Sequence, residues 1–370
     1  MNLVSLYSGC GGLDLGFHAA GFRTIWANEI SPDACETLRS EFWRIGAPIR
    51  QIECGDIREM GLPDPENADI VIGGPPCQGF SVAGRMDPND PRSRHVWEFF
   101  RVVEELQPRA FVMENVKALG ANTRWKSTRK ALIQRGEELG YSTRLLLLNA
   151  ADYGVPQLRE RMFLVGIRGG CVMPTPTPTE QRISVRDALR DLPPYGHPGN
   201  ASCCGAIITP ARNPVMRKSP FAGMLFNGQG RPIDLEQPAP TLPASMGGNR
   251  TPIIDQESLE TGTEPWIAQY HRHLIAGGAP YSKVPPRLRR LTVEEAAALQ
   301  GFSPGMKFSG SQCAKFRQIG NSVPPPLAKA VAETLLSTLK SEGTRIEWKG
   351  GQSVYVLEEA AKYDFLNEAH

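Results

Sequence analysis

The sequence predicts an α/β fold in which an open sheet binds a nucleotide-type cofactor, followed by a smaller, loop-rich domain. Residues 2–27 have the pattern of a strand, a glycine turn, a helix and a second strand. The apolar run at 70–72 ends abruptly in Gly73-Gly74-Pro75-Pro76, just before Cys77. A proline–threonine run at 173–179 then marks the start of the second domain.

Length and composition indicate a globular protein of two domains. The chain has 370 residues, of which 41% are hydrophobic and 22% are charged. No apolar run approaches the ~20 residues that span a membrane, and the N-terminus lacks the basic region of a secretory signal. We therefore expect a cytoplasmic, nucleoid-associated bacterial protein. The eight cysteines form no Cys-x-x-Cys pair, so we expect no metal site and no disulfide framework.

The first elements predict a cofactor site. We expect a strand at 2–7, a turn at 8–12, a helix at 13–20 and a strand at 22–27, and then a helix that begins with Ser31 as cap and Pro32. Glu29 ends the second strand, where an acid can accept hydrogen bonds from ribose hydroxyls. Asp14 stands where the dinucleotide motif has its third glycine, which favours an adenosine without phosphates.

The following elements bring Cys77 and Glu114 to one edge of the sheet. Cys77 follows a strand at 68–72, and Glu114 follows a strand at 110–113. Helices are predicted at 93–106, 124–139 and 325–340, and paired strands at 143–148 and 162–167. A capping box, Thr292 with Glu295, predicts a helix at 291–299, and 318–324 is expected to be a turn. The expected domains are 1–170 and 288–342 (catalytic), 171–287 (smaller domain) and a tail of unknown role at 343–370.

Positive charge is concentrated locally although the net charge is only +2. The stretches 115–136, 192–233 and 265–293 contain arginines and lysines but no acidic residue. One such stretch is usually a solvated face, but three of them predict a basic surface that neutralises phosphates.

The motifs, in their order, resemble those of the cytosine-5 DNA methyltransferase family. The resemblance covers residues 7–324, and its most specific part is Pro75-Pro76-Cys77-Gln78 followed by Glu114-Asn115-Val116. Tyr7 departs from the phenylalanine usual in the family. The resemblance implies a Rossmann-like sheet of the S-adenosylmethionine-dependent methyltransferases and a target-recognition domain. Further matching motifs are Tyr7-Ser8-Gly9-Cys10-Gly11-Gly12, Gly55-Asp56-Ile57, Gln157-Leu158-Arg159-Glu160-Arg161 and Gln318-Ile319-Gly320-Asn321-Ser322-Val323-Pro324.

The resemblance assigns four catalytic residues. A thiolate of Cys77 is expected to add to carbon 6 of cytosine, which makes carbon 5 nucleophilic. Glu114 is expected to hold and protonate ring nitrogen 3, and Arg161 to contact the base carbonyl. Arg159 is expected to stabilise the site electrostatically.

The implied cofactor is S-adenosylmethionine, with S-adenosylhomocysteine as product and no metal. Tyr7 is expected to stack on adenine, Glu29 to bind the ribose and Asp56 to bind the adenine amino group. Asn321, Ser322 and Val323 are expected to complete the pocket. The other residues implied at this site are Ser8, Gly9, Gly11, Gly12, Ile30, Ile57 and Pro76.

The implied substrate is a cytosine flipped out of a specific double-stranded DNA sequence. The loop at 81–94 resembles the family's mobile loop, and Gln78, Ser81 and Arg92 are expected to contact DNA. Thr241 is expected to contact the backbone beside the flipped base, and Gln229 to fill the vacated stack. We expect a monomer that modifies DNA alongside a cognate restriction endonuclease.

Three other readings are open at this point. A transfer-RNA cytosine-5 methyltransferase shares the catalytic motifs, but that branch typically carries Cys-Phe-Thr, which is absent here. A catalytically silent DNA-binding relative would lack a reason to keep Cys77, Glu114 and Arg161. A nicotinamide oxidoreductase would explain only the first strand–turn–helix unit.

Overall fold

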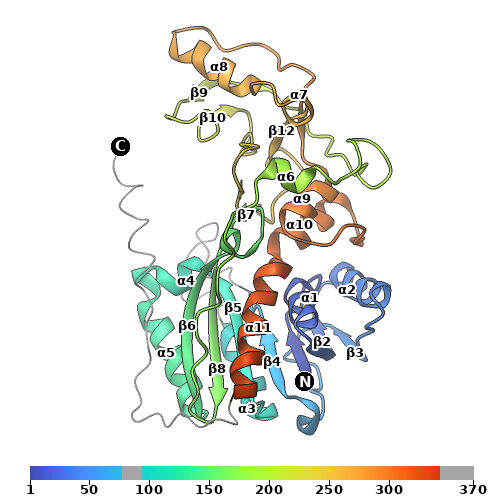
Figure 1. Cartoon of the computed structure of the whole chain (residues 1–370), viewed down its shortest axis with the longest axis vertical. Coiled ribbons are helices and arrows are strands. Elements are labelled where there is room, and N and C mark those ends of the chain that lie inside the picture. Colours follow the sequence, from blue (N-terminus) through green and yellow to red (C-terminus); the bar gives the residue numbers. More distant parts are fainter. Residues whose placement is uncertain (77–93, 342–370) are drawn as a thin grey trace. The chain divides into compact units, whose positions relative to one another are not determined.

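The computed structural model describes residues 1–76 and 94–341, which form two compact units (Figure 1). The first unit contains Met1–Tyr153, Glu160–Thr179 and, among the described residues, 325–341. The second contains Gly154–Arg159 and Glu180–Pro324. The compact border at Pro324 lies later in the chain than residue 288, where the motifs place the return to the catalytic domain. The functional assignment of 288–324 therefore stays a prediction.

The first unit is built on a seven-stranded mixed sheet in the order β3-β2-β1-β4-β5-β8-β6, which confirms the α/β class. Neighbouring strands from β3 to β5 run parallel, and β8 is antiparallel to both β5 and β6. The order reverses beside β1 and β4, which is where ligands bind in open α/β sheets. The strands are β1 (Asn2–Leu6), β2 (Arg23–Glu29), β3 (Gln51–Cys54), β4 (Ile70–Gly73), β5 (Ala110–Val116), β6 (Tyr141–Asn149) and β8 (Glu160–Arg168).

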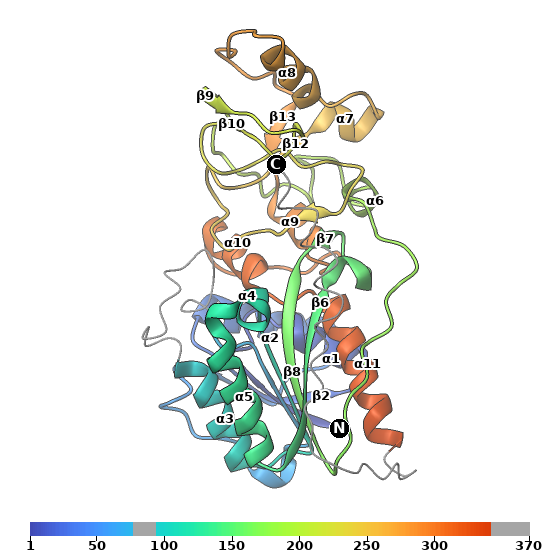
Figure 2. The ribbon, with the colours of Figure 1, turned by 90° about the vertical axis from the view of Figure 1, so that its left-hand side faces the viewer.

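Helices cover both faces of this sheet. Figure 2 shows α3, α4 and α5 on one face and α1 and α11 on the other. Phe99, Phe100 and Phe111 form the centre of the core on the α3 side, with ring centroids 5.4–6.1 Å apart. The helices are α1 (Gly12–Ala19), α2 (Pro32–Arg44), α3 (His95–Leu106), α4 (Lys117–Ala121), α5 (Lys126–Glu138) and α11 (Pro325–Ser341); the 3-10 turns are η1 (Pro65–Asn67), η3 (Thr123–Trp125) and η4 (Ala150–Tyr153).

A glycine allows α1 and α11 to pack closely, although 305 residues lie between the end of α1 and the start of α11. A Cβ on Gly16 would lie 2.4 Å from the Ala328 Cβ and 2.6 Å from the Pro325 carbonyl oxygen. No side chain fits at this contact, so α11 can dock only against the bare backbone of α1. The contact ties the end of the described chain to the first helix.

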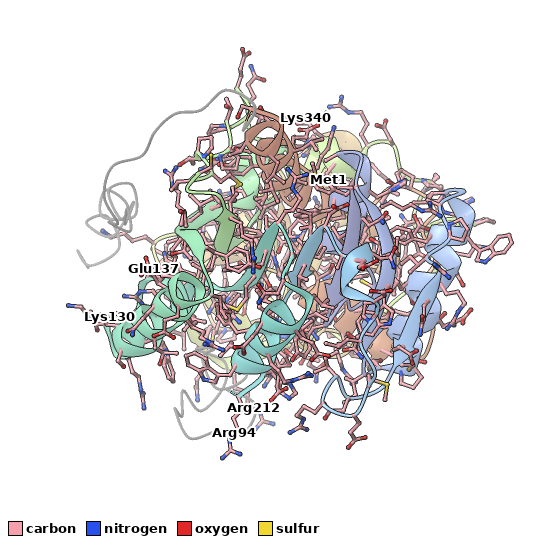
Figure 3. All side chains as sticks on the ribbon, turned by 90° about the horizontal axis from the view of Figure 1, so that it is seen from below. Met1, Arg94, Lys130, Glu137, Arg212 and Lys340 are labelled. Atoms are coloured by element: carbon pink, nitrogen blue, oxygen red, sulfur yellow. The ribbon has the colours of Figure 1, made fainter. Side chains whose placement is uncertain are left out.

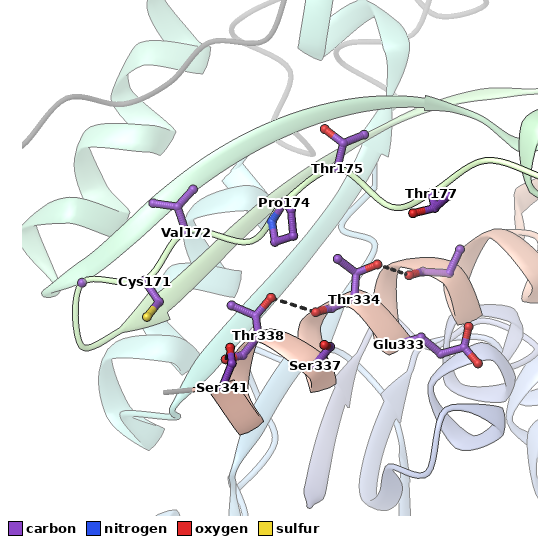
Figure 4. A pocket seen from close by; sticks show the side chains of 12 residues that line it. Cys171, Val172, Pro174, Thr175, Thr177, Glu333, Thr334, Ser337, Thr338 and Ser341 are labelled. Atoms are coloured by element: carbon purple, nitrogen blue, oxygen red, sulfur yellow. Dashed lines mark hydrogen bonds between the residues drawn. The ribbon is translucent and has the colours of Figure 1, made fainter. Parts of the chain in front are cut away.

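The chain after β8 runs along the first unit as an extended linker. The Arg144 guanidinium donates to the Met173 carbonyl at 2.8 Å, and the Tyr153 hydroxyl donates to the Pro176 carbonyl at 3.1 Å. A groove of about 800 Å³ lies between this linker and α11 (Figure 4). The hydroxyls of Thr334 and Thr338 line it but already donate to carbonyls of their own helix.

The second unit has short strands and short helices around a small core of its own. Leu225 and Phe226 pack there with Ile267, Tyr270 and Leu288. The prediction of a loop-rich, partly β domain omitted the helices α6, α7 and α8. The elements are β7 (Gln157–Leu158), α6 (Val185–Leu189), β9 (Pro210–Val215), β10 (Met224–Phe226), β11 (Ala239–Pro240), β12 (Ile253–Asp255), α7 (Gln256–Thr261), α8 (Trp266–Ile275), β13 (Leu288–Arg290), α9 (Val293–Leu299) and α10 (Gln312–Asn321).

Two local predictions are wrong and one is confirmed. Residues 318–321, expected in a turn, form the last turn of α10, because Phe316 and Ile319 give this helix a buried face. Ser31 precedes α2, but its side chain makes no capping hydrogen bond. The capping box of α9 is present, with Thr292 Oγ1 accepting from the Glu295 N–H at 3.0 Å and Glu295 Oε2 accepting from the Thr292 N–H at 3.0 Å.

Charged side chains remain at the surface of the first unit. Lys130 and Glu137 of α5 are exposed and project from the helix (Figure 3).

Within the described ranges, no helix has the length and apolar character of a membrane span. The same residues include no cluster of three or more His, Cys, Asp or Glu side chains that could hold a metal.

Candidate active site

The turn after β1 is shaped by residues in the left-handed region. Tyr7, Gly9 and Gly11 have φ angles of 54°, 56° and 89°; Ser8 lies between the first two, and Gly12 begins α1. Only glycine adopts such angles without strain, so Tyr7 is held there by its surroundings. No heavy atom lies within 4 Å of the place where a Cβ on Gly9 would be. The turn therefore presents open backbone at the carboxyl end of β1.

Glu29 is fixed at this turn by two backbone N–H groups. Its Oε2 accepts from Gly9 at 2.9 Å, and its Oε1 accepts from Ser31 at 2.8 Å. Burial raises the pKa of Glu29, and the hydrogen bonds from Ser31 and Gly9 oppose that rise. Each carboxylate oxygen retains a lone pair after these bonds, so the pair of oxygens can accept from two adjacent hydroxyls of a ribose.

Asp56 is a second acceptor at the same edge. The Arg58 Nε donates to Asp56 Oδ1 at 2.9 Å, and this hydrogen-bonded ion pair lowers the pKa of Asp56 to about 2. Asp56 is thus ionised at neutral pH and can accept from an amino group. Ile30 is 66% exposed, whereas Ile57 is 1% exposed within the core, so Ile57 could meet a ligand only through its backbone.

Tyr7 is held by His95. The Tyr7 hydroxyl lies 3.1 Å from the His95 Nδ1, and the two rings meet edge to face with centroids 5.5 Å apart. Burial raises the pKa of Tyr7, so its hydroxyl stays protonated. The two carboxylates match the hydroxyl and amino donors of an adenosine without phosphates, and the tyrosine ring matches the flat face of its base. The open glycine backbone leaves room for such a ligand. The residues present therefore fit the expected cofactor.

Glu114 and Arg161 form a nearly buried ion pair across β5 and β8. Arg161 Nε lies 2.9 Å from Glu114 Oε1, and the side chains are 13% and 11% exposed. The pair arises from the strand register, which sets Val116 opposite Arg161. Two of the residues predicted as catalytic therefore meet in the fold.

The segment before Cys77 lies against this ion pair. A Cβ on Gly74 would come within 3.0 Å of Glu114 Oε2, so glycine gives the carboxylate room. Asn115 Nδ2 donates to the Pro75 carbonyl at 3.2 Å and fixes the bend before the half-buried Pro76. Asn115 belongs to the sequence motif but had no predicted role; its neighbour Glu114 was the only signal for one.

The predicted Cys77, Gln78, Ser81 and Arg92 lie outside the described residues. Arg159, by contrast, lies in the second unit and is fully buried. Its Nη2 donates to the Gly320 carbonyl at 2.7 Å and its Nη1 to the Leu242 carbonyl at 3.3 Å. These contacts give Arg159 a supporting role in that unit, and its electrostatic role in catalysis stays a prediction.

The other predicted residues also lie in the second unit. Thr241 Oγ1 donates to the Leu158 carbonyl at 2.6 Å, and Gln229 is exposed. Asn321, Ser322 and Val323 follow one another at the end of α10, where Gln300 Nε2 donates to the Ser322 carbonyl at 2.6 Å. Their part in a cofactor pocket stays a prediction.

Comparison with known proteins gives a consistent result. The family model described as C-5 cytosine-specific DNA methylase matches residues 1–337. The type II methyltransferase M1.HphI of Haemophilus parahaemolyticus is 33% identical over 357 residues, covering 92% of this chain and 88% of the relative. M.FnuDI of Fusobacterium nucleatum is also 33% identical, over 352 residues, with 92% and 95% covered.

Solved structures show the same fold. An E. coli prophage protein, described as a DNA modification methyltransferase, superimposes with a TM-score of 0.63 at 23% identity, covering 92% of this chain and 99% of its own. The Dnmt2 methyltransferase of S. pombe superimposes with a TM-score of 0.60 at 17% identity, covering 94% of this chain and 99% of its own. The chain belongs to the C-5 cytosine-specific DNA methylase family and is a DNA (cytosine-5-)-methyltransferase, as its motifs predicted.

Proposed function

We propose that the protein is the modification enzyme of a type II restriction–modification system and methylates a cytosine flipped out of one double-stranded DNA sequence. The observation that supports the chemistry most directly is the Glu114–Arg161 ion pair beside the Gly74–Pro75 bend. The carboxylate and the guanidinium lie beside Gly74 and Pro75, which precede Cys77 in the chain by two to three residues. The two relatives named above are both type II methyltransferases, which supports the biological role.

Cys77 begins the proposed reaction. Its thiolate forms a bond to carbon 6 of cytosine, and the ring electrons move toward nitrogen 3, which Glu114 protonates. Arg161 orients Glu114 and contacts the base carbonyl, where negative charge develops. Carbon 5 then takes the methyl group that S-adenosylmethionine would supply, and nitrogen 3 returns its proton to Glu114. Loss of the carbon 5 proton to solvent water and expulsion of the Cys77 thiolate restore the aromatic ring.

The cofactor of the family is S-adenosylmethionine, which supplies an electrophilic methyl group when bound. In this chain Glu29 would accept from the ribose hydroxyls and Asp56 from the adenine amino group. Tyr7 would present its ring to the adenine, and the open backbone of Gly9 and Gly11 would lie along the methionine part. Asn321, Ser322 and Val323 would close the pocket.

DNA is the substrate implied by the family. Thr241 would contact the phosphate backbone beside the flipped base, and Gln229 would fill the gap in the stack. We also propose that the enzyme is a monomer in the bacterial cytoplasm, associated with the nucleoid, and that a cognate endonuclease cuts the same sequence. The transfer-RNA alternative is not favoured, since the family model and the named relatives are DNA methyltransferases.

Expression in a bacterium without cytosine methylation tests this function. Bisulfite sequencing of the chromosome should reveal 5-methylcytosine at one short sequence in nearly every copy. The Cys77→Ser variant, produced at the same level, should leave that sequence unmodified. Modified cytosine confined to RNA, or methylation by the Cys77→Ser variant, would contradict the proposal.

A further inference from the structure

Three exposed cations of the second unit lie close together in one segment of the chain. The acid-free stretch 265–293 is partly neutralised by acids outside it: Arg272 pairs with Glu264 at 2.5 Å, Arg287 with Asp255 at 2.6 Å and Arg289 with Glu295 at 2.6 Å. The stretch 192–233 differs. Arg212, Arg217 and Lys218 are exposed, and within residues 1–76 and 94–341 their side chains have no ion pair or hydrogen bond.

Arg212 projects from a large bulge in the β9–β10 ribbon. Val215 lies opposite Met224, and Pro210 lies opposite Phe226. Four residues of β9, 211–214, therefore face the single residue Leu225 of β10, three more than a regular ladder allows. Bulges of this kind bend a strand and redirect its side chains, and they are frequent at functional sites.

Prolines and side-chain hydrogen bonds restrain the backbone of the bulge. Pro210 and Pro214 bracket it, and since proline has a fixed φ and no N–H, both stiffen it and interrupt the ladder. At its base the Asn227 side chain donates to Thr209 Oγ1 at 2.8 Å and to the Pro210 carbonyl at 3.3 Å. Leu225 of β10 is 1% exposed and belongs to the core of the unit together with Ile267 and Tyr270 of α8.

Two side chains on the outside of this bulge suit base recognition. Arg212 and Asn213 are both exposed, and neither side chain has a partner among the described residues. A two-stranded ribbon fits the major groove of DNA, where arginine pairs with guanine O6 and N7, and asparagine with adenine N6 and N7. Val215 and Met224, which are 42% and 44% exposed, add an apolar surface next to them.

We infer that the bulge at 211–214 is the element that reads the target sequence, and that Arg212 recognises a guanine in the major groove. The inference rests on the proposed DNA methylation. Asn213 contacts the neighbouring base, whereas Arg217 and Lys218 lie beyond the strand and attract the phosphate backbone without reading sequence. The recognition sequence of this enzyme therefore contains a guanine besides the target cytosine.

The test compares Arg212→Ala with Lys218→Ala, a control that removes one exposed cation from the connection between β9 and β10. Methylation rates are measured on the wild-type target duplex and on duplexes with one base pair changed at a time. Wild-type enzyme should discriminate at every position. In Arg212→Ala, the preference for guanine at one position of the target should fall by roughly 10- to 100-fold. In Lys218→Ala, methylation of every duplex should slow to the same extent, so that the preferences between duplexes stay as in the wild type.

A modified base identifies the contact itself. Replacing that guanine by 7-deazaguanine removes the N7 acceptor, so it should slow wild-type enzyme and leave Arg212→Ala unaffected. If Arg212→Ala is too slow to assay, competition binding with the same duplexes gives the same ratios. The inference would be overturned if Arg212→Ala discriminated between duplexes as the wild type does, or if Lys218→Ala lost the same preference at the same position. Either result would leave the proposed function standing. A wild-type enzyme that methylates no DNA sequence would overturn the proposed function with it.

Discussion

Glu114 carries the proposed proton transfer, and its surroundings suit that role. The carboxylate is 11% exposed and lies 2.9 Å from the Arg161 guanidinium, in a space that Gly74 leaves open. Electrostatic contacts are stronger in such a place than in water, so the removal of one charge has a large effect. Both residues were predicted from the sequence motifs, but their contact depends on antiparallel pairing of β5 with β8.

Replacing Glu114 by glutamine keeps the shape of the side chain and removes its acid. Methyl transfer in a single turnover should fall by roughly 100- to 10,000-fold, while binding of S-adenosylmethionine stays as in the wild type. The control is Glu160→Gln, which breaks the half-exposed ion pair with Lys117 at 3.0 Å in the same sheet. Equal losses in the two variants would remove Glu114 from the chemistry.

Asp14 gives a pH dependence of stability. It is fully buried, accepts from Thr24 Oγ1 at 3.3 Å, and its pKa is raised to about 6 by burial. A carboxyl group whose pKa is higher in the folded state than in the unfolded state makes its full contribution to stability below the unfolded pKa, near 4. That contribution is lost as pH rises toward the folded pKa, near 6. The free energy of unfolding should therefore fall by roughly 3 kcal/mol over this range.

The Asp14→Asn variant should lack this component, because it cannot ionise. Urea unfolding of both proteins between pH 4 and pH 7 measures it as the difference between the two curves. Parallel curves would show that Asp14 is not the group responsible.

At the scale of elements, the sequence was most informative where a pattern is local. The glycine turn, the strand ahead of Cys77 and the capping box of α9 depend on neighbours in the chain, and all are present. The amphipathic helix α8 was missed although Ile267, Tyr270 and Leu274 follow helical spacing, since the surrounding prolines and glycines indicated loops. The bulge in β9 depends on pairing with β10 and has no local signal besides its prolines.

The α1–α11 contact predicts a large effect from a single methyl group. Gly16→Ala places a Cβ 2.4 Å from Ala328, so the helices must separate, at a cost of roughly 1–3 kcal/mol or more. Gly61→Ala is the matched control, because open space surrounds that position and its φ is not positive. Thermal unfolding should show a lower Tm for Gly16→Ala alone. A Gly16→Ala protein as stable as Gly61→Ala would contradict the close packing.

For the whole molecule, the sequence predicted the α/β class and the family, and the structure adds how distant segments are joined. Three acid-free stretches predicted a basic surface, yet pairs such as Arg287–Asp255 and Arg135–Glu104 join residues about thirty positions apart and neutralise part of that charge. Only tertiary structure shows which cations stay unpaired. In the segment at 210–226, Arg212, Arg217 and Lys218 are exposed and have no ion pair among the described residues.

The central claim is covalent catalysis by Cys77 on a flipped cytosine. DNA that carries 5-fluorocytosine at the target position tests it, because fluorine at carbon 5 cannot leave as a proton does. With S-adenosylmethionine present, the wild-type protein should form a complex with this DNA that survives denaturation, and Cys77→Ser should form none. A wild-type protein that methylates ordinary DNA but traps no fluorocytosine, or an adduct that persists in Cys77→Ser, would contradict the mechanism.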